Sequence, residues 1–322
     1  MCIRDRHILW STSKAILGSL VWRFLRDGTL NEDALITKYV PELADTAFKG
    51  ATIRQTLDMQ TGIQFRWDMP AGGNGKWKKE EWEFGTPEFE QATHEKARWA
   101  RANGTSPQLW NERGTGQYDC LLTLKTLERP HGQLFNYHEP NCIAMQLVME
   151  RVTKTPLLEL LDQHLWSRLG AEQGVTMWID PVGSAVSNIG LAVCARDLAR
   201  WGQLLLDDGK VHGQQVFPAV LLEDVASNGE PENYKEQSNL WGMFPVQTAL
   251  RNYLITTPAD ALGLRQPYFV GLNLQCVYMD RIRLIVIVKS SSNVADPSVT
   301  DPRDLAAIQE LSEKLPELVS SR

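Results

Sequence analysis

Apolar residues recur with a helical period in several stretches of this chain, and these stretches predict its main helices. The first covers residues 14–27, which are apolar on most sides until Asp27-Gly28, so we expect a mostly buried helix that ends there. Similar patterns predict helices from residue 141 to about 152, from about 195 to 206, and over 303–319. The last of these is amphipathic, with apolar residues along one side.

Two local signals add further elements. Thr52-Ile53-Arg54-Gln55 has the capping-box pattern and predicts a helix that begins there and ends before Gly62. Residues 275–279 and 283–289 are alternating or continuously apolar around Asp280-Arg281, which indicates an antiparallel β-hairpin. The chain therefore runs from a helix through a helical middle to a sheet and a terminal helix. This order predicts an α/β protein in which an α-rich lobe interrupts an α/β lobe.

Between these regular stretches, the segment from Gln64 to about Gly116 is irregular and rich in glycine and charge. It carries five of the eleven tryptophans, Trp67, Trp77, Trp82, Trp99 and Trp110. Loop-rich segments of this length are usually functional or flexible. The tryptophans could form the walls of a pocket or could pin long loops to the body of the protein, and we favour the second interpretation.

Composition narrows the range of functions. The chain has 322 residues, of which 43% are hydrophobic, so it can bury a large core. Its net charge of −6 gives no electrostatic footprint for nucleic acid, and no apolar segment reaches the length of a membrane span. The five cysteines are scattered and odd in number, and the six histidines show no metal-binding spacing. We expect buried free cysteines, no metal and no cofactor.

The candidate chemistry begins with a Ser-x-x-Lys sequence at Ser11 and Lys14, at the start of the first helix. Side chains three residues apart share one helix face, so the hydroxyl and the amine can meet. A buried lysine loses its proton more easily and can then accept the proton of the serine. The alternative is an N-terminal cap, in which Ser11 or Ser13 accepts backbone N–H groups and Lys14 is solvated.

Five segments of the chain, taken together and in their order along the sequence, resemble the serine β-lactamase-related hydrolases. That family includes class C β-lactamases, penicillin-binding peptidases, EstB-type esterases and 6-aminohexanoate-dimer hydrolases, and the last are the most similar in style. The resemblance covers nearly the whole chain. The segments are Trp10-Ser11-Thr12-Ser13-Lys14, residues 52–63, Phe135-Asn136-Tyr137-His138-Glu139-Pro140-Asn141, residues 165–172 and residues 196–202.

The resemblance implies a β-lactamase/transpeptidase-like α/β fold, with an antiparallel sheet flanked by helices and a separate all-α lobe. We expect one catalytic domain over residues 7–322, with an α/β lobe formed by 7–48 and 185–322 and an α-rich lobe formed by 49–184. Family members have strands of the sheet before the Ser-x-x-Lys helix, and we expect those strands to be missing here.

The first six residues, Met-Cys-Ile-Arg-Asp-Arg, resemble translated sequencing-adapter read-through. We therefore expect residues 1–6 to be non-native, as in a gene fragment from a metagenome. The alternative is an ordinary polar N-terminus. Neither interpretation predicts where in the cell the protein works.

The resemblance also implies hydrolysis of a small-molecule ester or amide through an acyl-enzyme. Ser11 is then the nucleophile, Lys14 the base with a pKa lowered by burial, and Tyr137 the proton relay. The oxyanion hole would combine the Ser11 amide with an amide in residues 271–275. The expected substrate contacts are Gly271, Asn273 and Glu139.

Two departures from the family pattern leave a second function open. Glu139 stands where relatives have Ser or Asn, and its carboxylate either pairs with Lys14 and keeps it protonated, or faces solvent. Leu274 adds bulk where close relatives have glycine. These changes suit a non-catalytic binding protein on the same fold. A β-lactamase or DD-peptidase is a further alternative, disfavoured because the Lys-Thr-Gly-type strand motif is absent. The oligomeric state is left open.

Overall fold

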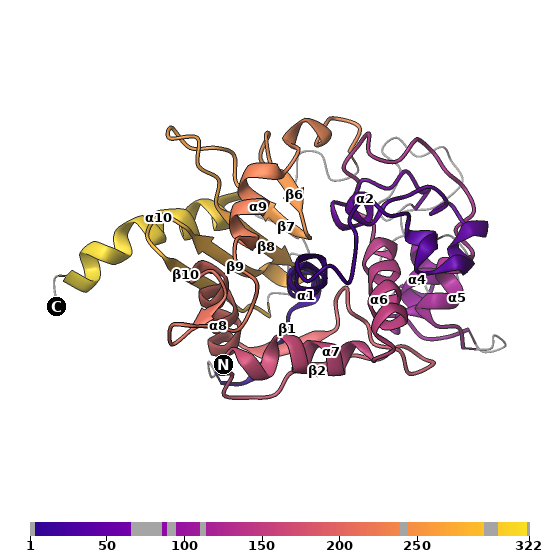
Figure 1. The fold of residues 1–322 in the computed structure, drawn as a ribbon, viewed down its shortest axis with the longest axis horizontal. Coiled ribbons are helices and arrows are strands. Elements are labelled where there is room, and N and C mark those ends of the chain that lie inside the picture. Colours follow the sequence, from indigo (N-terminus) through magenta and orange to yellow (C-terminus); the bar gives the residue numbers. More distant parts are fainter. Residues whose placement is uncertain are drawn as a thin grey trace.

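The structure is a computed structural model, and Figure 1 shows helix α1 at its centre. A β-sheet with helices α8, α9 and α10 lies on one side of α1, and helices α2, α4, α5 and α6 lie on the other (Figure 1). Helix α7 passes along the lower edge in this view. The part of the chain that the structure describes is residues 4–65, 86–88, 95–109, 114–238, 244–292 and 302–320.

Helix α1 (Ser13–Arg26) confirms the predicted buried helix to within one residue at each end. Eleven of its residues are buried because it contacts elements on both sides, among them α6, α7 and strand β7. Arg23 and Arg26 lie in the last turn, and Gly28 follows with a φ of +81°, a conformation that favours glycine. The helix that carries the Ser-x-x-Lys lysine is thus fixed along its whole length.

The main sheet has five antiparallel strands in the order β10-β9-β8-β7-β6. The predicted hairpin is confirmed: β9 and β10 pair with Val286 opposite Met279. Strand β9 is buried throughout, and helices α8 and α9 pack on the sheet while α10 contacts β10. The strands are β6 (Ala249–Arg251), β7 (Leu254–Thr256), β8 (Pro267–Gly271), β9 (Gln275–Asp280) and β10 (Ile285–Lys289).

The helices on the sheet follow the predicted patterns. Helix α8 (Ala195–Leu206) has the predicted bounds, and α10 (Pro302–Ser320) extends the predicted terminal helix by one residue at each end. Between them lies α9 (Leu221–Asn228). The predicted apolar side of α8 is buried because it faces β9 and β10; its members are Leu198, Trp201, Leu204 and Leu205.

A small antiparallel sheet joins the start of the chain to α8. Its order is β1-β3-β2, with strands β1 (Arg6–Ile8), β2 (Thr176–Met177) and β3 (Leu191–Cys194). The N–H of Leu9 donates to the carbonyl of Leu191 at 2.8 Å, so the chain is held against β3 just before Ser11. A separate two-stranded ribbon is formed by β4 (Lys210–Val211) and β5 (Gln214–Gln215).

On the other side of α1, helix α6 follows the predicted bounds closely. The helices there are α2 (Ile53–Leu57), α4 (Glu95–Ala102), α5 (Gln117–Leu122) and α6 (Pro140–Thr153). Helix α7 (Leu157–His164) is the one along the lower edge in Figure 1. Six short 3₁₀ turns connect the described elements: η1 (Trp10–Thr12), η2 (Ile36–Lys38), η3 (Pro41–Asp45), η5 (Trp166–Arg168), η6 (Pro231–Asn233) and η7 (Leu272–Leu274). The exact lobe boundaries stay a prediction.

The capping box at Thr52 is confirmed, but the predicted length of its helix is wrong. The Thr52 side chain accepts from the Gln55 N–H, and the Gln55 side chain accepts from the Thr52 N–H. The helix ends at Leu57 because Met59 adopts a left-handed conformation with a φ of +52°, and the N–H of Gln60 donates back to the carbonyl of Gln55 at 2.8 Å. The Asp58 carboxylate accepts from the N–H of Asn252 at 3.0 Å and lies 3.1 Å from Arg54, one turn earlier. A local backbone turn therefore ends this helix, and Asp58 then connects it to a distant segment.

An ionic cluster connects α2 with the β6–β7 turn and α9. Arg54 donates to the Asn252 side chain at 2.7 Å, and Arg251 pairs with Asp224 at 2.7 Å and with Asp58 at 3.4 Å. Asp58 is 4% exposed, so its charge depends on these partners. The cluster holds the β6–β7 turn against the side of α1.

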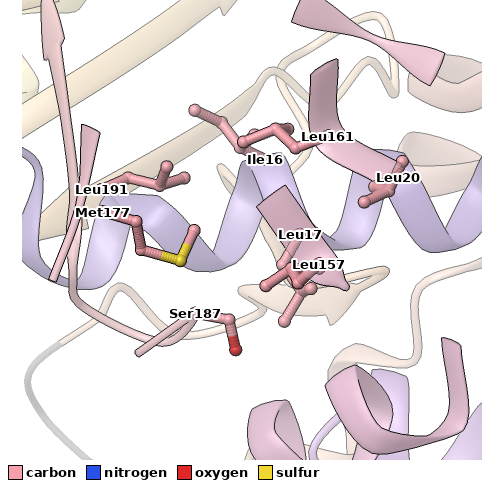
Figure 2. Close-up of a pocket in the computed structure, with 8 residues that line it drawn as sticks. All are labelled: Ile16, Leu17, Leu20, Leu157, Leu161, Met177, Ser187 and Leu191. Atoms are coloured by element: carbon pink, nitrogen blue, oxygen red, sulfur yellow. The ribbon is translucent and has the colours of Figure 1, made fainter. Parts of the chain in front are cut away.

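A small apolar cavity lies along α1 on its α7 side. Figure 2 shows its lining: Ile16, Leu17 and Leu20 from α1, Leu157 and Leu161 from α7, and Met177, Ser187 and Leu191. Its volume of about 10 Å³ is close to the minimum for one water molecule. It leaves no room for a substrate.

Four of the five cysteines lie in the described part of the chain, and all four are free and buried, as predicted: Cys120, Cys142, Cys194 and Cys276. Cys2 lies outside the described residues. Within the described ranges, no helix combines the length and the apolar character needed to cross a bilayer.

Candidate active site

Ser11 lies in the η1 turn and Lys14 in the first turn of α1. The Lys14 Nζ donates to the Ser11 Oγ at 3.1 Å. Trp10 has a φ of +49°, a strained conformation for a large side chain that is often found at functional sites. The turn thus gives the predicted contact between the hydroxyl and the amine.

The alternative of an N-terminal cap is wrong. Neither the start of η1 nor the start of α1 has a side-chain cap, and the Ser13 Oγ accepts the N–H of Leu191 at 3.2 Å. Lys14 is fully buried, which excludes the solvated lysine of that interpretation. A burial of this kind needs specific partners for the amine.

Lys14 has three oxygen partners besides the Tyr137 hydroxyl. Besides the Ser11 Oγ, its Nζ donates to the backbone carbonyl of Asn188 at 2.8 Å and lies 3.5 Å from the Oε1 of Glu139. A protonated lysine has three N–H bonds, so each of them has an acceptor here. The arrangement suits a charged ammonium.

The predicted lowering of the Lys14 pKa is wrong. Burial lowers this pKa, but the nearby Tyr137 and the carboxylate of Glu139 raise it, and the net result is a raised pKa. The physical reason is the counter-charge, because a buried ammonium that touches a carboxylate is stabilised against losing its proton. Lys14 therefore holds its proton in the resting protein.

Tyr137 lies just before α6, and its ring faces Lys14 with 4.9 Å between Nζ and the ring centroid. Burial raises the pKa of Tyr137 to about 12, although Lys14 and hydrogen bonding to Lys14 and Ser11 act in the opposite direction. The phenol is therefore protonated near neutral pH and close to both other groups. One cluster is thus formed by Ser11, Lys14 and Tyr137, although Ser11 and Tyr137 are 126 positions apart in the chain.

Glu139 lies in the same cluster, at the N-cap of α6. It is 2% exposed, so the alternative in which it faces solvent is wrong. Its Oε1 pairs with Lys14, and its Oε2 accepts the indole N–H of Trp99 at 2.8 Å. We expected this residue to contact substrate, but both of its oxygens are engaged by protein groups.

Gly271 brings the end of β8 against the η1 turn. A Cβ at this position would lie 2.4 Å from the carbonyl oxygen of Leu9 and 3.1 Å from the Ser11 nitrogen, so only glycine permits the approach. The segment after it, η7, has positive φ values at Asn273 and Leu274 and is half-buried. The expected oxyanion segment thus lies beside the Ser11 amide.

Sequence reasoning missed two residues of the cluster, Asn188 and Trp99. Asn188 is separated from Lys14 by 174 positions and contributes a backbone carbonyl, for which no side-chain motif could give a signal. Its own side-chain amide is buried and has no partner among the described residues.

Trp99 belongs to the tryptophan-rich segment, which was the available signal. Its buried ring packs edge-on against Phe65 at 5.6 Å, which favours the pinning interpretation for this tryptophan. The other four tryptophans of that segment, Trp67, Trp77, Trp82 and Trp110, lie outside the described residues.

Comparison with known proteins defines the class to which this fold and cluster belong. The Beta-lactamase family profile matches residues 4–228, and the chain belongs to this family. The predicted β-lactamase/transpeptidase-like fold, an antiparallel sheet with helices, is thereby confirmed.

Among individual proteins, the chain is 29% identical over 291 residues to the 6-aminohexanoate-dimer hydrolase of Paenarthrobacter ureafaciens. The match covers 89% of this chain and 66% of that protein, so the chain spans slightly less than two thirds of its relative's length.

Solved structures share the fold. A Bacillus anthracis protein provisionally named 6-aminohexanoate-dimer hydrolase aligns with a TM-score of 0.78 and 22% identity, over 98% of this chain and 74% of that one. EstCE1, described as a hydrolase with promiscuous acyltransferase activity, aligns with a TM-score of 0.62 and 14% identity, over 90% and 81%. A D-stereospecific amidohydrolase from Streptomyces aligns with a TM-score of 0.58 and 15% identity, over 86% and 79%.

Proposed function

We propose that this chain is a serine hydrolase that cleaves small ester or amide bonds through an acyl-enzyme on Ser11. The observation that carries the proposal is the 3.1 Å contact between the Ser11 hydroxyl and a fully buried Lys14, with Tyr137 against both. A buried amine with fixed partners beside a serine is an arrangement that can move the proton of the serine during attack. The amide substrate of the Paenarthrobacter relative supports this class of substrate.

In the proposed reaction the Ser11 Oγ attacks the substrate carbonyl carbon, and the hydroxyl proton passes into the Lys14 cluster. The bond to the leaving group then breaks, and the Tyr137 hydroxyl donates a proton to the leaving nitrogen or oxygen. Tyr137 recovers its proton from Lys14. Water repeats the sequence on the acyl-enzyme and releases the acid, with the Ser11 proton restored.

The oxyanion of each tetrahedral intermediate would be stabilised by the Ser11 amide and an amide of the η7 segment. The close approach of Gly271 to the Ser11 nitrogen supports this placement. One such donor is typically worth about 3 kcal/mol of barrier. Asn273, half-buried in η7, is our candidate for a polar contact to substrate.

A second candidate function is non-catalytic binding on the same fold. The observation that favours it is the buried ion pair between Lys14 and Glu139, since a protonated lysine is no base. The two functions predict opposite results with reagents that acylate or phosphonylate an activated serine.

The test combines a fluorophosphonate probe with hydrolysis of a p-nitrophenyl ester. We expect the protein to be labelled and to turn over the ester, and Ser11→Ala to abolish both. Ser19→Ala is the matched control, because Ser19 lies on the same helix and donates only to the carbonyl of Ala15, at 3.0 Å. Equal turnover by the Ser11 variant would remove the mechanism, and an unreactive wild-type protein would favour binding. Nitrocefin hydrolysis would instead indicate a β-lactamase.

A further inference from the structure

The raised pKa of Lys14 creates a chemical problem for the proposed reaction. An ammonium that already has three N–H bonds has no lone pair with which to accept the Ser11 proton. Tyr137 offers no alternative base, because its phenol is also protonated near neutral pH. A proton must leave Lys14 before or while the proton of Ser11 arrives.

We propose that the acceptor behind Lys14 is Glu139, so that the Lys14–Glu139 pair, and not Lys14 alone, takes up the Ser11 proton. This inference rests on the proposed function. As the Ser11 hydroxyl proton moves to Nζ, one ammonium proton moves from Nζ to Oε1 of Glu139. Glu139 acts through Lys14 and is therefore a positioning residue for the proton.

The step is balanced in atoms and charge. The Ser11 Oγ–C bond forms, the carbonyl becomes an oxyanion, Lys14 stays an ammonium and Glu139 becomes a carboxylic acid. When the bond to the leaving group breaks, Tyr137 gives that group a proton, Lys14 restores Tyr137, and Glu139 returns its proton to Lys14. The resting ion pair is then re-formed without any exchange with bulk water.

The geometry supports this path. The Nζ of Lys14 lies between the Ser11 Oγ at 3.1 Å and the Glu139 Oε1 at 3.5 Å, with its third bond held by the Asn188 carbonyl. The pair is buried, with side chains 0% and 3% exposed. In such an environment separated charges lose solvation, so a neutral amine and acid are closer in energy to the ion pair than they are in water.

Two contacts, with Trp99 and with the N-terminus of helix α6, stabilise the Glu139 carboxylate when no proton has been transferred to it. The indole N–H holds Oε2 of Glu139 at 2.8 Å, which leaves Oε1 directed at Lys14. The N-terminus of the 14-residue α6 favours negative charge at its N-cap, where Glu139 lies. Both contacts stabilise the carboxylate and so drive the return of the proton to Lys14 after each step.

The other titratable groups that act on Lys14 are Tyr137 and, from α6, Cys142, and Tyr253 from the β6–β7 turn lies against Cys142. Burial raises the pKa of Cys142 to about 12 and that of Tyr253 well above its ordinary value, so both are neutral near pH 7. The ion pair of this cluster is the one between Lys14 and Glu139. Changes in the pH profile on substitution of Glu139 can therefore be assigned to the pair.

The test is the pH dependence of kcat/KM for p-nitrophenyl ester hydrolysis in wild type, Glu139→Gln and Glu139→Asp. Glutamine keeps the size of the side chain and an oxygen for Trp99 but cannot accept the proton. We expect a loss of about 100-fold near pH 7, with a rate that rises with pH because Lys14 must now lose its proton to water. Aspartate keeps the carboxylate at a greater distance, so we expect a smaller loss and the wild-type shape of the profile.

The outcomes separate the two proposals. A Gln variant as fast as wild type near pH 7, or faster, would show that Glu139 merely blunts Lys14 and would overturn the inference alone. A wild-type protein that neither reacts with fluorophosphonate nor hydrolyses ester would overturn both proposals. If thermal melting shows that the Gln variant is unfolded, the Asp variant decides, because a rate that rises with pH as expected for a lone lysine would contradict the inference.

Discussion

Replacement of His138 should remove much of the acid sensitivity of this protein. His138 is 2% exposed, its Nδ1 has no hydrogen-bond partner among the described residues, and the ring of Phe65 lies edge-on at 5.8 Å. Burial, helped by the charge of Arg129, lowers the pKa of His138 from 6.5 to about 3. A proton on Nδ1 would add a buried charge that has no acceptor among the described residues.

The sign follows from comparing the two states. In the unfolded chain His138 becomes protonated as the pH falls through about 6.5, whereas in the folded protein it stays neutral until about pH 3. The free energy of unfolding is therefore unaffected by this group above pH 6.5 and falls as the pH is lowered below that value. Near pH 5 the loss is about 2 kcal/mol.

The assay is urea unfolding of wild type and His138→Gln near pH 7.5 and near pH 5. The variant should lose about 2 kcal/mol less stability between the two conditions than wild type. His131, whose pKa burial also lowers, contributes equally to both proteins and cancels in the comparison. His212→Asn, at an exposed turn, is the control for the replacement of a histidine as such. An equal loss of stability in wild type and His138→Gln would refute the reasoning.

Two glycine substitutions, at Gly18 and Gly271, test how the segments around the cluster are packed. Gly114→Ala is the control, because its added Cβ would lie at an ordinary distance of 3.7 Å from its nearest neighbour. Gly18→Ala would place a Cβ 1.9 Å from the carbonyl oxygen of Asn252. Urea unfolding should therefore show a free energy of unfolding lower by about 1–3 kcal/mol, although alanine has the better helix propensity. A higher free energy of unfolding would contradict the packing. Gly271→Ala should push β8 away from η1 and lower kcat/KM for ester hydrolysis by about 100-fold, and an unchanged rate would exclude this segment from the oxyanion site.

The helices and the hairpin could be predicted from the sequence because the spacing of their apolar residues indicates which side of each element is buried. Helices α1, α6, α8 and α10 follow those periods to within about one residue at each end, and the β9–β10 hairpin forms where it was predicted, with β10 beginning two residues later than expected. The contact between Ser11 and Lys14 was equally local, since the two residues are only three positions apart.

The sequence could not decide where α2 ends or what the tryptophan-rich segment contacts. Helix α2 stops at Leu57 because Met59 takes a left-handed φ of +52°, at a position where no glycine marks the turn. The indole of Trp99 meets a carboxylate 40 positions away. No pattern in the chain marks this carboxylate as the partner of Trp99, because side-chain contacts between distant segments depend on how whole elements pack.

The sequence by itself determined that a serine and a lysine would meet at the start of a buried helix. Only the tertiary structure decided the charge on that lysine. Burial alone would release its proton, whereas a carboxylate from α6 holds it, and which effect is larger depends on a distance of 3.5 Å between groups 125 positions apart. Electrostatic energies change steeply over such distances in a buried site. The tertiary structure, and not the Ser-x-x-Lys motif, therefore decides whether Lys14 is protonated.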